Sequence, residues 1–365
     1  MFRQKTTIVI GAGASCEIGL PSGDRLKAQI ATLFAGSNEN SYGLKNTSMI
    51  AAVKDRLGQR NRVYVNSPPL HHDEQIVTIR EAAKRIRVGL PLALSIDNFL
   101  HTHQADAEVV RLGKTAIAMC ILAAERGSAF YDEVTPATNH QQRLQGTRRS
   151  ITLTSKKMLE SWYVPFVQLL MSGIGKADAK EVFRNLRFVI FNYDRCLEQY
   201  LWLALQSYFD LTREAAAEIL STVEFLHPYG SLGPLPWQTI AEEHSVQLGG
   251  SEDLDVWQVG SRIRTFTESV ESDLEPRIRS AIEDPSTILI LGFGYLDQNV
   301  QLLTPGDKRN ASRIISSAYG VSQLDQDIIR EVMRSFARAT GPQIMLEPGT
   351  CRALFDNFRL QLTLR

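Results

Sequence analysis

Cysteine is scarce in this chain of 365 residues. The four cysteines are far apart and include no CxxC pair: Cys16, Cys120, Cys196 and Cys351. This spacing argues against a disulfide framework and against a structural zinc site. No apolar run approaches the roughly 18 residues of a membrane span, and no basic and apolar leader precedes the first apolar segment. We therefore expect a soluble, cytoplasmic protein that does not bind a membrane.

An excess of charge of either sign is also missing. The 40 basic residues balance the 40 acidic ones, so the formal net charge is zero. Nucleic acids and anionic surfaces attract strongly basic proteins, and this chain offers no such bulk attraction. We expect no direct binding of nucleic acid. Any partner must therefore be recognised by local groups.

Two common phosphate-binding signatures are incomplete. The apolar run Thr6–Ile10 leads into Gly11-Ala12-Gly13-Ala14-Ser15, and Gly19-Leu20-Pro21-Ser22 follows. Glycines let a backbone approach a pyrophosphate closely, and a following helix start favours the anion. A dehydrogenase fingerprint requires a third glycine where Cys16 stands, and a Walker loop requires Gly-Lys-Ser/Thr. The turn therefore indicates a nucleotide-binding loop of another kind.

Short, nearly continuous apolar runs recur along the chain and are typical of parallel strands covered on both faces. They are Thr6–Ile10, Arg187–Phe191, Val223–His227 and Thr287–Leu291, with weaker examples at Arg313–Ala318 and Gln343–Leu346. Helical periodicity lies between them, in 22–33, 105–126, 155–172, 194–208, 257–283 and 323–338. Strands that alternate with helices predict an α/β fold with a Rossmann-like, doubly wound parallel sheet.

The interval 35–183 offers helical patterns but no convincing strand. We interpret the chain as a single domain, 1–365, whose core comprises 1–34 and 184–365 and whose residues 35–183 form a helical insertion. Two polar segments, 36–48 and 132–150, are predicted to be loops. Arginines in the second, at 143, 148 and 149, would contact phosphates or a partner, or simply lie in a solvated loop.

Polar residues follow two of the predicted strands. Asn192 and Asp194 come directly after the run that ends at Phe191, and His227 ends the next run. Ligands of open α/β sheets bind at such strand ends. An amide orients a ribose hydroxyl without a change of charge, and an imidazole takes up a proton near neutral pH. The simpler alternatives are that Asn192 and Asp194 cap a helix and that His227 is structural.

Two further patterns are a glycine pair after an apolar run and two pairs of histidines. Gly292-Phe293-Gly294-Tyr295 follows the run Thr287–Leu291 and precedes Asp297. Its glycines allow an adenine or a ribose to lie against the backbone, or they form an ordinary tight turn. The pairs His71-His72 and His101/His103 resemble metal ligands in composition, but no further ligand follows at a diagnostic spacing. We expect no metal site.

Taken in order, the segments GAGAS with GLPSG, FNYD, HPYGSLG and LGFGYLDQN resemble the sirtuin-like NAD hydrolase family of bacterial anti-phage defence proteins. The resemblance also includes Ser95–Leu100 and the ending with Leu346-Glu347, Cys351, Phe355 and Phe358. It covers essentially the whole chain. The combination is fairly specific, although no single motif is.

The resemblance implies a sirtuin-like fold and a set of site residues. Asn192 and His227 would be catalytic. The residues that would bind NAD+ are Gly11, Ala12, Gly13, Ala14, Ser15, Pro21, Asp194, Gly230, Ser231, Gly292 and Asp297. In the family, histidine commonly stands directly before the glycine, whereas here Tyr229 precedes Gly230. The zinc-binding cysteine pairs of deacetylating sirtuins have no counterpart either, so no zinc is expected.

The implied activity is hydrolysis of NAD+, as substrate, to nicotinamide and ADP-ribose. Such an activity would drain the cell unless it were gated. The resemblance implies a homo-oligomer that is activated by a phage-derived trigger or by a partner such as a helicase-like hexameric ATPase of the HerA type. Two alternatives remain open. One is a non-catalytic NAD or ADP-ribose sensor or scaffold, and the other is an NAD-dependent protein deacylase or ADP-ribosyl transferase.

Overall fold

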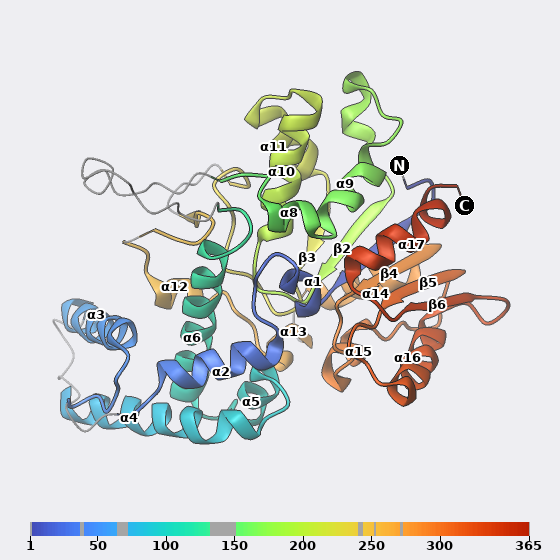
Figure 1. Ribbon diagram of the computed structural model, residues 1–365. Helices are drawn as coiled ribbons and strands as arrows, with labels where there is room; N and C mark the ends of the chain where they lie inside the picture. Colours follow the sequence, from blue (N-terminus) through green and yellow to red (C-terminus); the bar gives the residue numbers. More distant parts are fainter. Residues whose placement is uncertain are drawn as a thin grey trace.

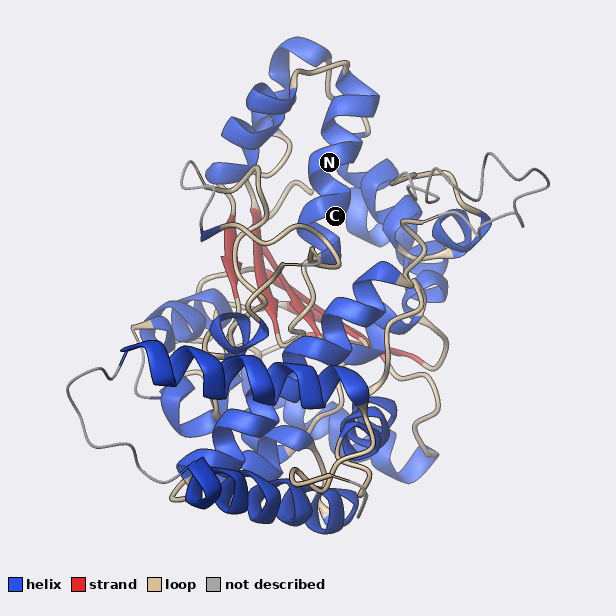
Figure 2. Ribbon diagram, turned by 90° about the vertical axis from the view of Figure 1, so that its left-hand side faces the viewer, coloured by secondary structure: helices blue, strands red, loops and turns tan. Residues whose placement is uncertain are grey.

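The computed structural model contains one sheet of six parallel strands with helices on both faces (Figures 1 and 2). It describes residues 2–36, 40–63, 72–131, 151–239, 244–251, 253–270 and 273–364. The strands are β1 (Thr6–Ile10), β2 (Leu186–Ile190), β3 (Glu224–Leu226), β4 (Thr287–Leu291), β5 (Arg313–Ser317) and β6 (Gln343–Glu347). Each of the six predicted strands is confirmed, and with them the doubly wound α/β fold.

The strands lie in the order β3-β2-β1-β4-β5-β6. β1 is central and pairs in parallel with β2 on one side and β4 on the other, with Thr6 opposite both Leu186 and Thr287. The chain therefore builds the sheet outward from β1 in one direction and then, from β4, in the other. The carboxyl ends of β1, β2 and β4 consequently meet at one edge of the sheet.

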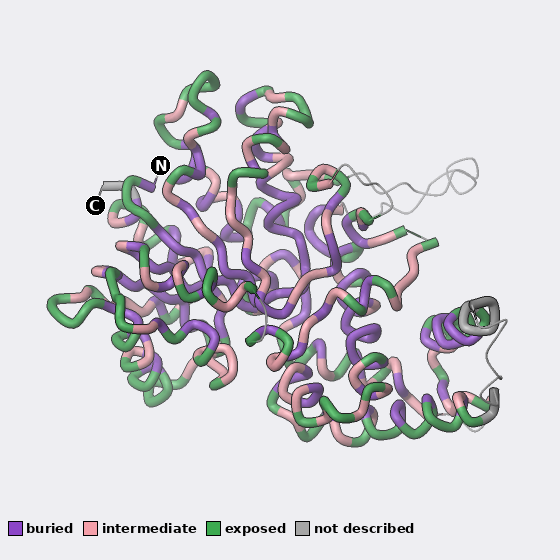
Figure 3. The backbone as a smooth tube through the Cα atoms, turned by 180° about the vertical axis from the view of Figure 1, so that it is seen from behind, coloured by how far each residue is buried: buried purple, intermediate pink, exposed green. Residues whose placement is uncertain are grey.

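Alternate residues of each strand enter opposite hydrophobic clusters. Ile8 and Ile10 of β1 belong to one buried cluster, and Val9 belongs to the other. The same alternation separates Val189 of β2 from Phe188. Side chains alternate across a strand, and both faces of this sheet are covered, so the strands are apolar throughout. Figure 3 shows the result as a buried centre beneath a largely exposed periphery.

Two groups of helices cover the two faces. The cluster that contains Val9 includes residues of α2 (Gly23–Leu33), α3 (Thr47–Val63), α4 (His72–Gly89), the 3-10 turn η1 (Leu90–Leu92), α5 (Ile96–Thr102), α6 (Ala107–Arg126), α12 (Val256–Gly260), α13 (Phe266–Val270), α14 (Leu274–Glu283), α15 (Asp297–Leu303) and α16 (Gln323–Phe336). The cluster that contains Ile8 includes residues of α1 (Ala12–Cys16), α8 (Lys156–Glu160), α9 (Tyr163–Met171), the 3-10 turn η2 (Lys176–Glu181), α10 (Cys196–Phe209), α11 (Arg213–Ser221) and α17 (Cys351–Leu364).

Within the predicted insertion 35–183, the described residues form helices and contribute no strand to the sheet. Helices α3 to α6 lie with α2 in a helical lobe beside the sheet, at the lower left of Figure 1. There α6 packs against α2, α4 and α12, whereas α9 packs against α10 and α17 over the sheet. Residues 132–150, with their three arginines, lie outside the described residues.

Two segments that were each predicted to form one helix are divided into shorter helices. Residues 155–172 form α8 and α9, because Ser161 is extended and the N–H of Trp162 donates to Glu17 Oε2 at 2.9 Å. Residues 257–283 form α12, α13 and α14. There the N–H of Arg264 donates to the carbonyl of Tyr229 at 2.9 Å instead of continuing a helix. Tertiary hydrogen bonds therefore interrupt both periodic segments.

Candidate functional site

The sheet reverses its direction of growth between β1 and β4, and both strands end there in glycine turns. Open α/β sheets bind ligands in the crevice beyond the carboxyl ends of their strands, at this kind of reversal. The N–H of Gly11 donates to the carbonyl of Leu291 at 2.9 Å, and the N–H of Gly13 donates to the carbonyl of Gly292 at 2.9 Å. The predicted Gly11–Ser15 loop and the predicted Gly292 turn are therefore in direct contact.

Close packing between the two turns requires their glycines. A Cβ on Gly11 would lie 2.5 Å from the carbonyl oxygen of Gly292, and one on Gly13 would lie 2.9 Å from it. Gly292 has a φ of 57°, and its Cβ would lie 2.0 Å from the nitrogen of Ala14. The N–H groups of Gly11 and Gly13 are already used between the turns. In this conformation, other groups of the loop would have to hold a phosphate.

Ser15 joins the glycine loop to the segment after β2. Its Oγ accepts a hydrogen bond from Asn192 Nδ2 at 2.8 Å and donates one to Asp194 Oδ2 at 2.9 Å. All three side chains are buried. Asp194 Oδ1 also accepts from the N–H of Cys196, the first residue of α10, at 3.1 Å. Asp194 thus accepts a hydrogen bond from the start of the helix, as expected of a capping residue. The side chain of Asn192 does not cap the helix and donates to Ser15 instead.

The amide oxygen of Asn192 differs from its nitrogen in having no hydrogen-bond partner within the described residues. Asn192 is only 8% exposed. A buried acceptor without a donor is unfavourable, so such a position suits a group that brings its own O–H or N–H. Asn192 Oδ1 therefore marks a place where a hydroxyl of a ligand, or a water molecule, would gain a hydrogen bond.

The carboxyl group of Asp194 is perturbed by its surroundings. Burial, as the largest cause, and the nearby charges of Glu125 and Glu198 outweigh the hydrogen bonds from Cys196 and Ser15, and together these influences raise its pKa from 3.8 to about 6. Desolvation disfavours the charged form of a carboxyl group, and like charges add to that effect. Asp194 therefore changes charge close to neutral pH.

Both ring nitrogens of His227 are engaged. Nε2 lies 2.8 Å from Glu198 Oε1, and Nδ1 lies 3.3 Å from the carbonyl oxygen of Asn192. Burial alone would lower the pKa of His227. The hydrogen bond and charge of Glu198, with smaller effects of the Asn192 carbonyl and Asp194, raise the pKa above its usual value. The structure thus brings His227 beside Asn192, but its Nδ1 faces a backbone carbonyl.

Aromatic residues from three of the predicted motifs pack against one another. Phe191 contacts Phe293 and Tyr229, with ring centroids 5.0 and 5.9 Å apart. The hydroxyl of Tyr229 donates to Asn299 Oδ1 at 2.7 Å. Tyr229 stands where the family commonly has histidine, and here it links its own loop to α15.

Asp97 is a site residue that the sequence did not single out. Its carboxylate accepts a hydrogen bond from the hydroxyl of Tyr193, in the FNYD segment. Burial raises the pKa of Asp97 to about 6, although the hydrogen bond from Tyr193 acts in the opposite direction. The only sequence signal was the position of Asp97 within the Ser95–Leu100 segment of the resemblance.

The remaining predicted residues are more dispersed. Gly230 has a φ of 71°, and its Cβ would lie 2.1 Å from the carbonyl oxygen of Arg262. Ser231 Oγ accepts from the N–H of Gly233 at 3.3 Å. Asp297 is exposed at the first residue of α15. The structure therefore assigns Gly230 and Ser231 a role in turn geometry and leaves Asp297 in solvent.

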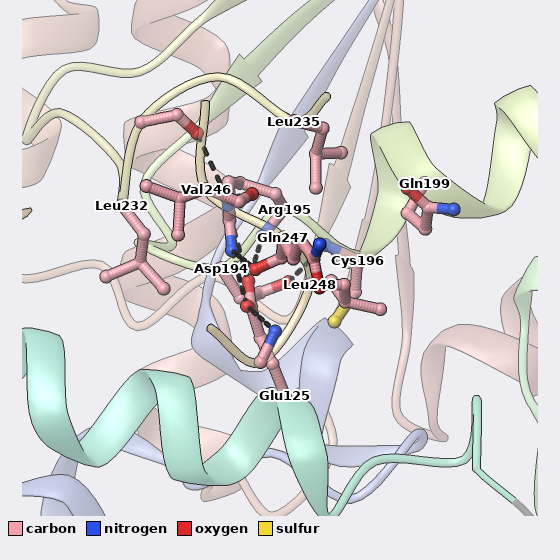
Figure 4. A network of polar contacts seen from close by, with 12 residues as sticks. Glu125, Asp194, Arg195, Cys196, Gln199, Leu232, Leu235, Val246, Gln247 and Leu248 are labelled. Atoms are coloured by element: carbon pink, nitrogen blue, oxygen red, sulfur yellow. Dashed lines mark hydrogen bonds and ion pairs between the residues drawn. The ribbon is translucent and has the colours of Figure 1, made fainter. Parts of the chain in front are cut away.

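A buried ion pair joins Glu125 to Arg195, the residue that follows Asp194 in the sequence. Arg195 Nη2 and Glu125 Oε2 are 2.6 Å apart, and the two side chains are 1% and 0% exposed. Arg195 also donates to the carbonyls of Gly233, Val246 and Gln247 (Figure 4). This network joins α6 to the start of α10 and to the segment after Gly230. No sequence pattern pointed to it, because its members come from distant parts of the chain.

A cleft of about 880 Å³ lies between α2, α3 and α6. Pro21 lines it, together with Arg25, Asp55 and Arg126. Asn192, Asp194 and His227 do not line it. Of the predicted site residues, Pro21 thus belongs to this cleft and is separate from the group formed by Ser15, Asn192 and Asp194.

The sequence predicts no metal site, and in the described part of the chain His101 and His103 contact other polar groups. There, no three His, Cys, Asp or Glu side chains are grouped so that they could hold a metal ion. His101 Nδ1 lies 3.0 Å from Thr267 Oγ1, and His103 Nδ1 lies 2.9 Å from the carbonyl oxygen of Phe99. His71 lies outside the described residues. None of the described helices has the length and apolar character needed to cross a membrane.

Neither a comparison with protein-family models nor one with curated proteins finds a match for the chain.

Proposed function

We propose that the chain is an NAD+ hydrolase that cleaves the bond between nicotinamide and ribose. The observation that carries the proposal is the buried side chain of Asn192. Its nitrogen is fixed by Ser15 of the glycine loop, and its oxygen lacks a donor within the described residues. Ser15 follows β1, one of the two strands between which the strand order reverses, and open α/β sheets bind ligands beyond the strand ends at such a reversal. Ribose hydroxyls are donors of the kind that Asn192 Oδ1 needs.

The reaction places modest demands on the protein. Nicotinamide leaves NAD+ as a neutral molecule, so the electron pair of the broken C1′–N bond goes to the ring nitrogen without a general acid. The ribose then carries positive charge, as in glycoside hydrolysis generally, and water adds to C1′ and loses a proton. Asn192 would orient a ribose hydroxyl and the water. Asp194, when ionised, would stabilise the positive charge through space.

His227 would accept the proton from the ribose hydroxyl or the water. Its Nδ1 lies beside the Asn192 carbonyl, 3.3 Å away, and this long contact would give way to the incoming hydroxyl. The adenosine end and the pyrophosphate would lie toward the Gly11–Ser15 and Gly292 turns. Because the N–H groups of Gly11 and Gly13 already donate to Leu291 at the end of β4 and to Gly292 in the turn after it, binding of the pyrophosphate would require these turns to separate slightly.

The proposed function includes control of the NAD+ hydrolase activity and assembly of the chain into an oligomer. An ungated NAD+ hydrolase would deplete its own cell, so we propose a homo-oligomer that acts in anti-phage defence and responds to a phage-derived trigger or to a helicase-like ATPase partner. Support for these roles comes from the sequence resemblance. The first comparison is NAD+ turnover by the chain alone and by the chain with a co-expressed partner.

A second function, a non-catalytic sensor of NAD or ADP-ribose, is favoured by one observation. Both nitrogens of His227 already have partners, Glu198 and the Asn192 carbonyl. A histidine held in this way can serve structure alone. In a sensor, NAD+ would bind at the reversal point and remain intact.

Calorimetric titration with NAD+, followed by chromatography of the same sample, tests the two functions together. The hydrolase predicts nicotinamide and ADP-ribose in equal amounts. The sensor predicts a binding isotherm and unchanged NAD+. Absence of both binding and turnover, with and without co-expressed partner, would contradict both functions.

A further inference from the structure

Glu198 is a buried acid with a single hydrogen-bond partner among the residues that the structure describes. It lies in the first turn of α10 and is 2% exposed. Its Oε1 is 2.8 Å from His227 Nε2, and its Oε2 is buried with no hydrogen-bond partner within the described residues. Burying a carboxylate is costly, and a single hydrogen bond does not fully offset that cost. Because burial of the Glu198 carboxylate is only partly offset, this side chain suits a functional role better than a stabilising one.

The contact selects one tautomer of the neutral imidazole. An ionised carboxylate only accepts hydrogen bonds, and a neutral imidazole carries one N–H. With Glu198 Oε1 facing Nε2, the proton is held on Nε2, because the other tautomer would set a lone pair against the carboxylate. Nδ1, 3.3 Å from the Asn192 carbonyl oxygen, donates to that oxygen only in the protonated ring; in the neutral ring Nδ1 carries the lone pair and this longer, weaker contact is lost. The basic nitrogen of His227 thus lies at the carboxyl end of β2, next to Asn192.

We propose that Glu198 is the positioning residue of His227: it fixes the ring, holds the proton on Nε2 and leaves Nδ1 to take a proton from the ribose hydroxyl or from water. The arrangement follows the logic of a base that is itself oriented by a third group. The proposal rests on the proposed NAD+ hydrolysis for the identity of the hydroxyl. The selection of the tautomer does not depend on that activity.

The charged groups that face His227 are few. Glu198 faces it from α10, and Asp194 acts on it from the segment before that helix. The polar backbone group beside it is the Asn192 carbonyl. Burial lowers the pKa of His227, and Glu198 is the largest of the opposing influences. Removal of the Glu198 charge should therefore lower the pKa of His227, even though Asp194 remains.

Glu198→Gln tests the positioning role, since it keeps the size of the side chain and removes its charge. Glu214→Gln, on the exposed face of the neighbouring helix α11, is the matched control. Nitrogen-15 spectra of labelled histidines report both the tautomer and the pKa, and His227→Gln identifies the signal among the seven histidines. We expect wild type and Glu214→Gln to show the Nε2–H tautomer. Glu198→Gln should show a lowered pKa and a mixture of tautomers.

The kinetic expectation is a loss in kcat of about 10²-fold in Glu198→Gln with KM within about threefold, since the base is misplaced and NAD+ contacts remain. Glu198→Asp keeps the charge on a shorter side chain and should recover part of kcat and of the pKa. It also serves if Glu198→Gln does not fold.

An unchanged tautomer and pKa of His227 in folded Glu198→Gln, or, where that variant does not fold, a kcat and a pKa in Glu198→Asp equal to those of wild type, would overturn the positioning role. If the spectra change as expected but wild type leaves NAD+ intact in every assembly, the proposed function fails, and the proton-transfer part of this inference fails with it.

Discussion

Asn192 Nδ2 donates to Ser15 Oγ at 2.8 Å, so a residue of the first glycine turn fixes the side chain that follows the second strand. The two residues come from distant parts of the chain and meet only because β1 and β2 are parallel neighbours. The hydrogen bond holds the Asn192 amide with its oxygen free of protein partners within the described residues. In the proposed function, this oxygen accepts a hydrogen bond from a hydroxyl of the ligand.

Removal of the Ser15 hydroxyl should weaken both stability and turnover. Ser15→Ala leaves the buried Asn192 nitrogen without its acceptor and Asp194 Oδ2 without its donor, while Asp194 Oδ1 keeps the N–H of Cys196. We expect the free energy of unfolding to fall by about 1–3 kcal/mol and NAD+ turnover to fall by about tenfold or more. Urea denaturation and product chromatography measure the two effects. Ser221→Ala removes an exposed hydroxyl and should change neither by a comparable amount; equal effects in both variants would contradict the assigned role.

The contact between the two glycine turns makes a specific stability prediction. In Gly292→Ala, the new methyl group would meet the backbone of Gly13 and Ala14, so the free energy of unfolding should fall by about 3 kcal/mol or more. Gly320 has a similar φ, 75°, but open space around it. Gly320→Ala should therefore cost only about 1–2 kcal/mol. Denaturation curves that coincide for the two variants would contradict the close packing of the Gly292 turn against Gly13 and Ala14.

The buried pair Glu125–Arg195 should be far more sensitive than a surface pair. Glu125→Gln leaves the Arg195 charge buried without its counter-charge, for which we expect a loss of about 3–5 kcal/mol. Asp327→Asn, in the more exposed pair with Arg330, should lose less than about 1 kcal/mol. The comparison requires only denaturation midpoints and slopes. A small loss in folded Glu125→Gln would mean that the network contributes little.

Stability should depend on pH through Asp194. Its pKa is about 6 in the folded protein and 3.8 as an unperturbed group, so the folded state binds the proton more tightly. Its contribution is therefore present below about pH 3.8 and is lost as the pH rises through about 6, a change of about 3 kcal/mol. Asp194→Asn removes this titration.

Chemical denaturation between pH 4 and pH 7.5 checks this sign. Relative to wild type, Asp194→Asn should become more stable as the pH rises across this interval. The exposed Asp307→Asn is the control and should follow wild type. A difference between Asp194→Asn and wild type that stays constant with pH would contradict the raised pKa.

Much of the fold could be predicted because the six strands are short, apolar on both faces and bounded by turn residues. The helices were less predictable. Residues 155–172 keep helical periodicity, yet Glu17, remote in sequence, accepts the N–H of Trp162 and divides the segment. Periodicity reports which face is buried, but it does not report hydrogen bonds to other parts of the chain.

The site could be predicted only in part, for a similar reason. Ser15, Asn192 and Asp194 follow adjacent strands, so their proximity follows from the topology. Glu198 lies inside an apolar helix, and its contact with His227 depends on how α10 packs beside β3. Likewise, the sequence assigned Gly11 and Gly13 to a phosphate, whereas the structure uses their N–H groups between two turns.

The most direct test of the account is the fate of NAD+ in the presence of the purified chain, alone and with its co-expressed partners, compared with Asn192→Ala. Asn310→Ala, an exposed asparagine, is the matched control. The account predicts nicotinamide and ADP-ribose from wild type and Asn310→Ala, and a loss of about 10²-fold or more in Asn192→Ala. Equal product formation by folded Asn192→Ala, or intact NAD+ with every preparation, would contradict it.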